Sequence, residues 1–488
     1  MTWYPDLRSY LEALDAVGDL EHVTREVDWD LEAAAATRLS YERREPAPLF
    51  ENVTGCGEGF RLLGAPAALS SVPGKPYMRI ALSLGLAADA TPAEIVEHLA
   101  RARKRPLVPP RVVPADQAPC KQNILLGDDA TLDRFPIPRI HQDDGGRYAN
   151  TWGVIVARTP DGRWTNWSIA RMQMLDGKHL TGLVIPQQHL GMIWGEWAAI
   201  GEPMPFALAQ GGVPAIPVIG GAALPAGVDE AAYLGALSGE PLDVVRCETI
   251  DLEVPATAEI VIEGHLSVTR HVTEGPFAEI HGYAFDDTTL EPEYTVEAIT
   301  HRDDPIWPFV VPGRPIDETH TVCGPGTSAE ALTLLRDAGL PITTAWQPLN
   351  GATHILVVTA PQDWRETLPE VSTAEFAHRV GAVLRANRVG PLCPVTYLLD
   401  DDIDPSVDGD LIWALGTRVH PTSRKKEWPG TVLPWYSNYT DDERVTGHGS
   451  LVVHDGLMPA RGGRYVSPAT FADAYPEAIR NKVLAAGD

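Results

Sequence analysis

A proline-dense segment between residues 106 and 119 constrains the fold of this chain more than any other sequence feature. Its prolines are Pro106, Pro109, Pro110, Pro114 and Pro119. Proline lacks a backbone N–H and its ring fixes φ, so the interior of a helix cannot tolerate this density. No helical period runs through the segment either. We therefore expect a linker that separates an N-terminal region from the rest of the chain.

Helix signals mark the region before this linker. Three leucines at helical spacing follow Asp6, a residue type common at helix N-caps: Leu7, Leu11 and Leu14. Gly18 suits the end of that helix. Further along, Thr91-Pro92-Ala93-Glu94 combines a capping box with proline at the first helical position. These signals predict a mixed α/β region.

The sequence becomes typical of β-structure between about residues 120 and 310. Thr151–Arg158 and Trp164–Met174 flank Thr159-Pro160-Asp161-Gly162, which is a strong turn signal. Together these segments predict a hairpin. Ala258–Val268 is a further strand candidate, with its isoleucines on one face.

An α/β pattern returns after about residue 320. Ser328–Ala338 predicts a helix, and Ser372-Thr373-Ala374-Glu375 opens another with a capping box. Ile355–Val358 and Val395–Leu399 predict buried strands. The whole chain therefore predicts an α/β (α+β) fold in which a β-rich centre lies between two α/β regions.

Length and charge limit the class of protein. A chain of 488 residues with 44% apolar residues can bury two or three cores. Its net charge of −27 argues against a nucleic-acid partner, because binding phosphates requires a basic surface. No segment is long and apolar enough to span a membrane, and the start lacks the pattern of a signal peptide, so we expect a cytoplasmic protein. Five scattered cysteines indicate neither disulfides nor a zinc site.

Three polar segments could carry chemistry. In Trp164–Arg171, Asn166 offers an amide oxygen and Arg171 a forked cation, although such a strand could equally pack a sheet. Pro186-Gln187-Gln188-His189 follows a buried strand, where His189 is either a structural residue or a ligand. Glu274–Tyr283 carries two carboxylates five residues apart, which suits acid–base chemistry or a solvated loop.

Other motifs point to no site. His141-Gln142-Asp143-Asp144 precedes two glycines and predicts a turn, and Asp400–Asp404 lacks the glycine and distal glutamate of a calcium loop. The sequence contains no P-loop, GxGxxG, GxSxG or HExxH pattern. A dehydrogenase with the usual dinucleotide fingerprint is therefore excluded.

Taken together, these segments resemble the UbiD family of decarboxylases, especially its ferulic-acid-decarboxylase branch. The resemblance also includes Asp6–Leu11, Gly145–Tyr148 and Asp176–Gly182. It implies an N-terminal α/β region over residues 1–118 and a split β-barrel that binds prenylated flavin mononucleotide (FMN) over 119–315. A C-terminal α/β domain that mediates homodimerisation would then cover 316–488.

The resemblance also implies a cofactor site. Asn166, His189 and Glu230 match positions that hold a divalent metal, usually Mn²⁺, against the cofactor phosphate, and K⁺ is expected nearby. An amide, an imidazole and a carboxylate suit such an ion. The residues expected to bind the cofactor are Asn166, Trp167, Ser168, Ile169, Ala170, Arg171, Gln188, His189 and Glu230. The branch often carries a lysine where this chain has Pro394, so no basic phosphate ligand is expected from that strand.

Arg171, Glu274 and Glu279 match the catalytic Glu-Arg-Glu network of the family. The implied reaction is the reversible, non-oxidative decarboxylation of an α,β-unsaturated, aromatic or heteroaromatic acid through a covalent adduct with prenylated FMN. Glu279 would be the proton donor. The residues expected to line the substrate pocket are Ile280, Gln188, Thr321, Thr431 and Leu433. The acid could be indole- or pyrrole-carboxylate-like. Thr431 stands where the cinnamate-acting branch carries a bulky aromatic, which leaves room for a bicyclic acid such as indole-3-carboxylate.

Alternatives follow from the same residues. A flavin-binding oxidoreductase on the same barrel would need a nicotinamide site, and a non-catalytic flavin carrier would not need Arg171, Glu274 and Glu279 together. A flavin-free metal decarboxylase fits the Asn166/His189/Glu230 set poorly. The expected partners are a small carboxylic acid, a flavin prenyltransferase that supplies the cofactor, and a second copy of the chain.

Overall fold

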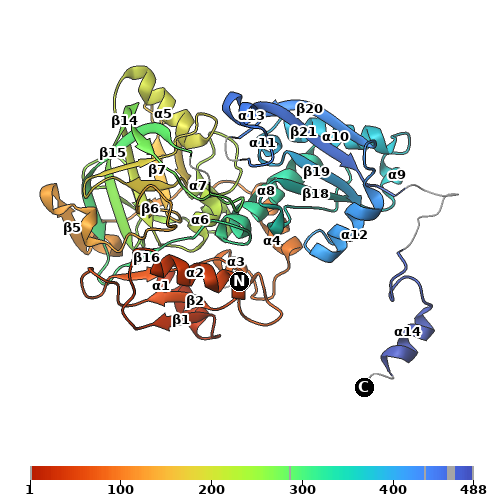
Figure 1. Cartoon of the computed structure of the whole chain (residues 1–488), viewed down its shortest axis with the longest axis horizontal. Helices are drawn as coiled ribbons and strands as arrows, with labels where there is room; N and C mark the ends of the chain where they lie inside the picture. Colours follow the sequence, from red (N-terminus) through yellow and green to blue (C-terminus); the bar gives the residue numbers. More distant parts are fainter. Residues whose placement is uncertain (1–2, 285–286, 434–435, 459–467, 486–488) are drawn as a thin grey trace.

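The structure is a computed structural model of the 488-residue chain, and it describes residues 3–284, 287–433, 436–458 and 468–485. Figure 1 shows a curled central sheet at the upper left, an N-terminal region, coloured red, below it, and a C-terminal α/β region, coloured teal to blue, to its right. The predicted β-rich centre between two α/β regions is thereby confirmed. No described helix is both long and apolar enough to cross a membrane.

The N-terminal region packs helices on a small sheet with the strand order β1-β2-β3-β16. Its elements are α1 (Leu7–Asp15), β1 (Leu20–Val23), α2 (Glu32–Arg43), β2 (Ala47–Phe50), β3 (Arg61–Leu63), α3 (Met78–Ser83), α4 (Pro92–Ala102) and β16 (Ile306–Pro308). Both predicted helices are confirmed. Asp6 caps α1, and α4 has the complete capping box that Thr91 and Glu94 predicted.

The proline segment is not wholly irregular. Within it, β4 (Arg111–Val112) pairs in parallel with β12 (Asp243–Arg246), which in turn pairs with β13 (Glu253–Pro255). The linker therefore runs along the central region.

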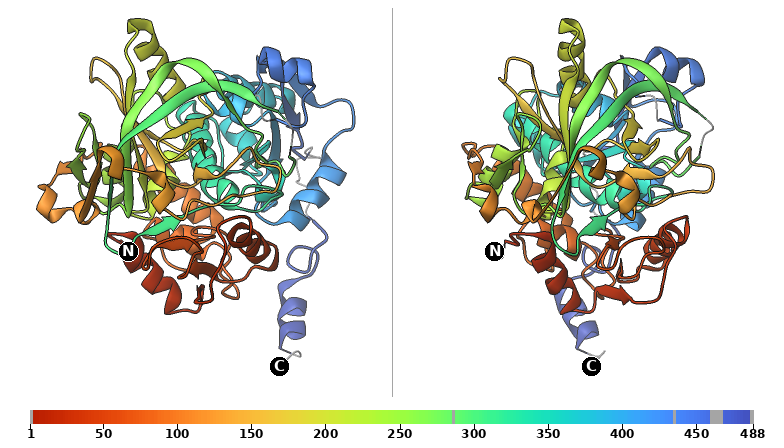
Figure 2. Two further views of the ribbon diagram at one scale, coloured as in Figure 1. Left: turned by 60° about the vertical axis from the view of Figure 1, so that its left-hand side comes forward. Right: turned by 90° about the vertical axis from the view of Figure 1, so that its left-hand side faces the viewer.

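The central sheet has the strand order β6-β9-β10-β15-β14-β11-β7-β8, with β5 paired to β15. Its strands are β5 (Asn123–Leu126), β6 (Tyr148–Asn150), β7 (Val154–Arg158), β8 (Thr165–Ser168), β9 (Met172–Met174), β10 (His179–Gly182), β11 (Met204–Gln210), β14 (Ile260–Glu274) and β15 (Thr289–His301). The predicted hairpin is confirmed as β7–β8. The strand predicted from Ala258 begins at Ile260 and continues to Glu274, and Figure 2 shows the long β14–β15 hairpin curving over the sheet.

Three helices of this region carry or adjoin the site: α5 (His189–Ile200), α6 (Ala215–Gly220) and α7 (Glu230–Ser238). Helices α5 and α7 begin at residues that the sequence predicted as metal ligands. Apolar side chains that include Ile155, Phe206 and Ile262 fill the core within the curled sheet.

The C-terminal region contains a sheet with the order β17-β18-β19-β21-β20. Its elements are α8 (Glu318–Asp337), β17 (Thr344–Trp346), β18 (Ile355–Ala360), α9 (Trp364–Thr367), α10 (Thr373–Arg385), α11 (Val389–Leu392), β19 (Val395–Asp400), α12 (Asp408–Arg418), β20 (Lys425–Thr431), α13 (Asp441–Thr446), β21 (His448–Asp455) and α14 (Glu477–Leu484). The predicted strands and the helix opened by Ser372 are confirmed.

Helix α8 is longer than predicted. It begins at Glu318, ten residues before the expected start at Ser328, and runs through Pro325. Proline interrupts exposed helices because it removes one hydrogen bond and crowds the preceding turn. Most of α8 is buried, so tertiary packing outweighs that local cost.

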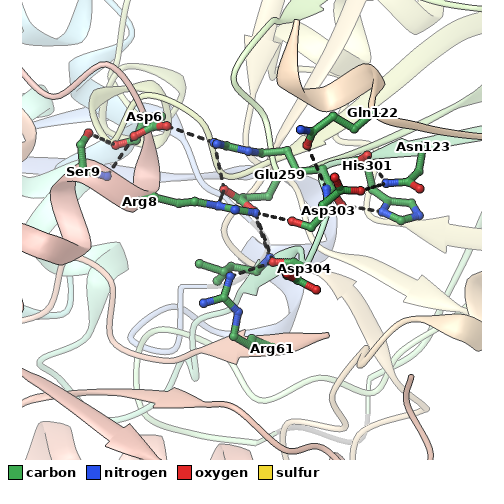
Figure 3. A network of polar contacts seen from close by, with 12 residues as sticks. Asp6, Arg8, Ser9, Arg61, Gln122, Asn123, Glu259, His301, Asp303 and Asp304 are labelled. Carbon is green, nitrogen blue, oxygen red and sulfur yellow. Dashed lines mark hydrogen bonds and ion pairs between the residues drawn. The ribbon is translucent and has the colours of Figure 1, made fainter. Parts of the chain in front are cut away.

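A polar network joins the N-terminal region to the central sheet (Figure 3). Arg8 of α1 donates from Nε and Nη2 to the carboxylate of Glu259 at 3.0 and 2.9 Å. Arg302 Nη1 and the backbone N–H of Ile306 donate to the same buried carboxylate at 3.3 and 3.1 Å. A buried carboxylate needs such partners, so this network fixes the N-terminal region at the start of β14.

Candidate active site

An arginine held between two glutamates lies at the end of β14. Arg171 follows β8, Glu274 is the last residue of β14, and Glu279 lies in the loop that leads to β15. Arg171 Nε and Nη2 each donate to one oxygen of Glu274 at 2.8 Å, and Nη1 donates to Glu279. The structure thus brings together the three residues that the resemblance assigned to catalysis.

The two glutamates of this cluster differ in environment. Glu274 forms a bidentate pair with Arg171, the arrangement that best stabilises a carboxylate. Burial, together with the charge of Glu274, raises the pKa of Glu279. Burial alone would lower the pKa of Arg171, but the charges of Glu279 and Glu274 raise it. Of the two carboxyls, Glu279 is the one whose surroundings favour the protonated form.

Residues 141–148 support the loop that connects Glu274 to Glu279. The carboxylate of Asp144 accepts from the backbone N–H of Ala278 at 3.1 Å, and the N–H of Gly145 donates to the carbonyl of Pro276 at 2.8 Å. A Cβ at Gly145 would lie 2.2 Å from the carbonyl oxygen of Gly275, so only glycine fits there. This segment forms the turn that the sequence predicted, and its position gives it a supporting role in the site.

Tyr148 contacts Glu274 directly. Its hydroxyl donates to Glu274 Oε1 at 3.1 Å, and its ring packs on Phe277, which also lies against the Arg171 guanidinium. We predict that Tyr148→Phe keeps the ring packing, removes this hydrogen bond and lowers kcat roughly tenfold, the effect of one hydrogen bond to a charged group. Steady-state kinetics with a thermal melt will test this. A change in KM alone would contradict it.

A second polar cluster comprises Asn166 of β8, His189 at the start of α5 and Glu230 at the start of α7. Asn166 Nδ2 lies 2.8 Å from Glu230 Oε1 and 3.3 Å from His189 Nδ1. Glu230 Oε2 accepts from the backbone N–H of Trp167 at 2.8 Å. All three side chains are buried. Burial raises the pKa of Glu230 to about 7, and burial with the charge of Arg388 lowers the pKa of His189 to about 3.

This second cluster fits a metal ion and a phosphate. Asn166 Oδ1 and the nearby Ser168 Oγ are buried and have no hydrogen-bond partner among the described residues. An orphaned acceptor indicates a missing ligand. An amide oxygen, an imidazole and a carboxylate form a donor set that suits Mn²⁺. No group of three His, Cys, Asp or Glu side chains that could hold a metal ion occurs within the described ranges, so an ion at this cluster would also need the amide oxygen of Asn166.

Arg388 joins this cluster and was missed by the sequence analysis. It lies between α10 and α11, six residues before Pro394, where no basic ligand was expected. Its Nη1 lies 2.7 Å from His189 Nε2 and 3.2 Å from the carbonyl oxygen of Leu224, and its Nη2 donates to Gln188 Oε1. The contact spans 199 residues, so no local pattern could reveal it.

One cavity of about 300 Å³ joins the two clusters. The residues expected at the cofactor or substrate that line it are Asn166, Ser168, Ile169, Ala170, Arg171, Gln188, His189, Glu230, Glu279 and Ile280. Trp167 is buried in the core instead and contributes its backbone N–H. Glu274 lies behind Arg171 and does not line the cavity.

The other three residues expected in the substrate pocket do not line this cavity. The Thr321 hydroxyl donates to the carbonyl of Ala67 at 2.8 Å, so its neighbours on α8, Val322 and Cys323, face the cavity instead. Thr431 lines a separate cavity beside β20, and Leu433 is buried. The directions in which the side chains of Thr321, Thr431 and Leu433 point depend on packing in the C-terminal region, and the sequence pattern gives no information about that packing.

Three family models match consecutive parts of the chain. They are described as the N-terminal, Rift-related and C-terminal domains of 3-octaprenyl-4-hydroxybenzoate carboxy-lyase, and they match residues 11–99, 111–315 and 320–437. The chain belongs to the UbiD family. Because the models cover most of its length, the resemblance seen in the sequence is confirmed.

Curated relatives of this UbiD-family chain act on small acids. It is 39% identical to pyrrole-2-carboxylic acid decarboxylase of Pseudomonas aeruginosa over 482 residues, covering 98% of this chain and 96% of that protein. It is 41% identical to ferulic acid decarboxylase 1 of Saccharomyces cerevisiae over 488 residues, with the same coverage.

Solved structures of UbiD-class enzymes share the fold. A dimeric form of HmfF from Pelotomaculum thermopropionicum, in complex with prFMN, has a TM-score of 0.77 at 26% identity and covers 96% of this chain and 98% of its own. Vanillic acid decarboxylase of Sedimentibacter hydroxybenzoicus in its closed form has a TM-score of 0.86 at 24% identity, covering 99% of both chains. The mixed α/β fold with a curled central sheet is thus that of UbiD-class enzymes.

Proposed function

We propose that this carboxy-lyase reversibly decarboxylates an α,β-unsaturated, aromatic or heteroaromatic acid with the help of prenylated FMN. The observation that carries the proposal is one cavity that is lined both by Arg171 and Glu279 of the Glu-Arg-Glu network and by Asn166, His189, Glu230 and Arg388. Membership of the UbiD family and the prFMN bound by a structural relative support it.

In this proposal the cofactor phosphate lies at the end of the cavity where Arg388 and the Asn166/His189/Glu230 set meet. A divalent ion, Mn²⁺ or one like it, would bridge that set to the phosphate, with K⁺ nearby. Arg388 would pair with the phosphate, because arginine suits phosphate oxygens geometrically.

The protein side chains would bind the acid and move one proton. Arg171 orients carboxylates and is itself held by Glu274. The cofactor supplies the electrophilic carbon that bonds to the substrate and the electron sink for breaking its C–CO2 bond. Glu279 then donates its proton to the carbon that carried the carboxyl group, and solvent restores that proton. Desolvation and the neighbouring acid raise the pKa of this carboxyl, which favours the protonated form that a donor needs.

The substrate class follows from the relatives, which act on pyrrole-2-carboxylate and on ferulic acid. The cavity lining includes apolar residues, among them Ile280, Leu183 and Ile185. A flat ring with a carboxylate matches that lining. We also propose that the protein is a cytoplasmic homodimer and that a flavin prenyltransferase supplies its cofactor.

Reconstitution tests the function. Protein produced with a flavin prenyltransferase and then oxidised should decarboxylate pyrrole-2-, indole-3- or phenylacrylic acids, whereas flavin-free protein should be inactive. Absorbance spectra with mass spectrometry of the released cofactor identify the flavin. Full activity without flavin would disprove the cofactor's role. Hydride transfer to a nicotinamide, or tight flavin binding with no turnover of any acid, would instead favour the oxidoreductase or carrier alternative.

A further inference from the structure

Both ring nitrogens of His189 face donor groups. Arg388 Nη1 lies 2.7 Å from Nε2, and Asn166 Nδ2 lies 3.3 Å from Nδ1. A neutral imidazole has one acceptor nitrogen and one N–H, and a guanidinium can only donate. The shorter contact therefore assigns Nε2 as the acceptor and leaves the hydrogen on Nδ1, which points toward Asn166 and toward Glu230 Oε1 at 3.7 Å.

This arrangement is incompatible with a metal on either nitrogen of His189. A metal bound through Nε2 would need the position that the Arg388 guanidinium occupies. A metal bound through Nδ1 would require the hydrogen to move to Nε2, where it would face the N–H of Arg388. In both cases the contact between Arg388 and His189 must break. The positive charge of the guanidinium also repels a divalent ion at this distance.

An incoming anion would bind the Arg388 guanidinium more strongly than its present partners do. Its described hydrogen bonds reach the neutral acceptors Gln188 Oε1 and Leu224 O, besides His189. Glu230 attracts its charge, but none of the described carboxylates forms an ion pair with it. A largely buried cation without an anionic partner is poorly stabilised. A phosphate ester offers two charged oxygens in the geometry that a guanidinium prefers.

We propose that Arg388 is a positioning residue that couples the two ligands of this site: it blocks His189 in the free protein, and a phosphate ester must draw it away before a divalent metal binds tightly. The inference rests on the proposed function, because it assumes that phosphate and metal share this end of the cavity. It adds an order of assembly, with phosphate before metal. Coupling is reciprocal, so the metal must in turn tighten phosphate binding by the same factor.

Mn²⁺ binding to the metal-free, flavin-free full chain tests this directly, measured as the loss of the free-ion paramagnetic resonance signal. FMN should tighten Mn²⁺ binding to the wild-type protein about ten- to a hundredfold, the range for a hydrogen bond from a charged donor. Riboflavin, which lacks the phosphate, should leave it unchanged. A mixture of FMN and Mn²⁺ without protein gives the baseline.

Two arginine variants distinguish the contact between Arg388 and His189 from a general effect of net charge on Mn²⁺ binding. Arg388→Met should bind Mn²⁺ alone at least about tenfold more tightly than wild type, and FMN should tighten Mn²⁺ binding less in this variant than in wild type, because only the phosphate's own contact with the ion remains. Arg385→Met removes an exposed arginine three residues away, at the end of α10, and should behave like wild type. Equal tightening by both variants would assign the effect to net charge and overturn the inference. If Arg388→Met fails to fold, Arg388→Gln, which keeps a polar side chain without the charge, takes its place in the same comparison.

The possible failures can be told apart. If wild-type protein binds FMN, and Mn²⁺ binds equally well with FMN, with riboflavin or with neither, the coupling and the ion's bridge to the phosphate are both wrong, while decarboxylation with prenylated FMN stands. If Mn²⁺ does not bind even when FMN is bound, both the metal's role in the proposed function and this inference fall.

Discussion

Glu279→Gln should abolish most turnover while leaving cofactor binding intact. Glutamine keeps the volume and hydrogen-bonding capacity of Glu279 but cannot deliver a proton to carbon. The loss in kcat should be at least the roughly 100-fold typical of a general acid. Exchange of the product's vinylic or ring hydrogen with D2O at the former carboxyl carbon should fall with it. Turnover and exchange are measured by mass spectrometry, with bound flavin determined from absorbance.

Glu291→Gln is the matched control for that variant. Glu291 is a buried glutamate of β15 that pairs with Arg270, and burial raises its pKa as it does for Glu279, but it lies outside the cavity. It should keep near-wild-type kcat. In the wild type, kcat should decline as pH rises through the raised pKa of Glu279, because the donor is then ionised. Near-native turnover in Glu279→Gln with full flavin occupancy would assign the donor role to Glu274 or water.

Glu230→Ala should lose metal and flavin together. The carboxylate holds Asn166 Nδ2 and the Trp167 N–H, and in the proposed site it also binds the ion that bridges to the phosphate. We expect both occupancies to fall by at least the roughly 10- to 100-fold seen when weaker, indirect supports of a metal are removed. Metal analysis and the flavin spectrum of the same sample measure the two quantities, and His189→Ala should behave alike.

Asp229→Ala provides the control, because Asp229 caps the same helix, α7, through the N–H groups of Ala231 and Ala232. Losing this cap should cost about 1 kcal/mol of stability, visible in a thermal melt, while metal and flavin remain. Full flavin occupancy in Glu230→Ala without metal would show that the ion does not bridge protein and phosphate.

Local chemistry made much of the fold predictable. The capping box at Thr91, the turn at Thr159–Gly162 and the buried strands at Ile355 and Val395 depend on neighbours within a few residues, and each formed as expected. The first turns of α8 were missed because Pro325 conceals a helix that only burial stabilises.

The residues of the candidate site likewise fall into those that the local sequence indicated and those that it did not. The segments that contain Arg171 and Glu274–Glu279 stood out as polar residues beside strands, and the family resemblance gave them roles. Glu230 did not stand out, because it begins an ordinary-looking helix and its contacts lie more than sixty residues away. Arg388 is more remote still. Such residues belong to the site only because the fold brings them together, so their own surroundings in the sequence carry no signal.

The residues that line the cavity come from two parts of the sequence, one before and one after about residue 315. Arg171, His189, Glu230 and Glu279 all precede that point, whereas the lining from Val322 to Tyr436 follows it. Mutation or recombination confined to the later part of the gene could therefore change which acid fits while every proton-transfer group stays in place, provided that Arg388 is kept. New substrate preferences could arise in this chain by exchanging one half of the cavity and inheriting the other unchanged.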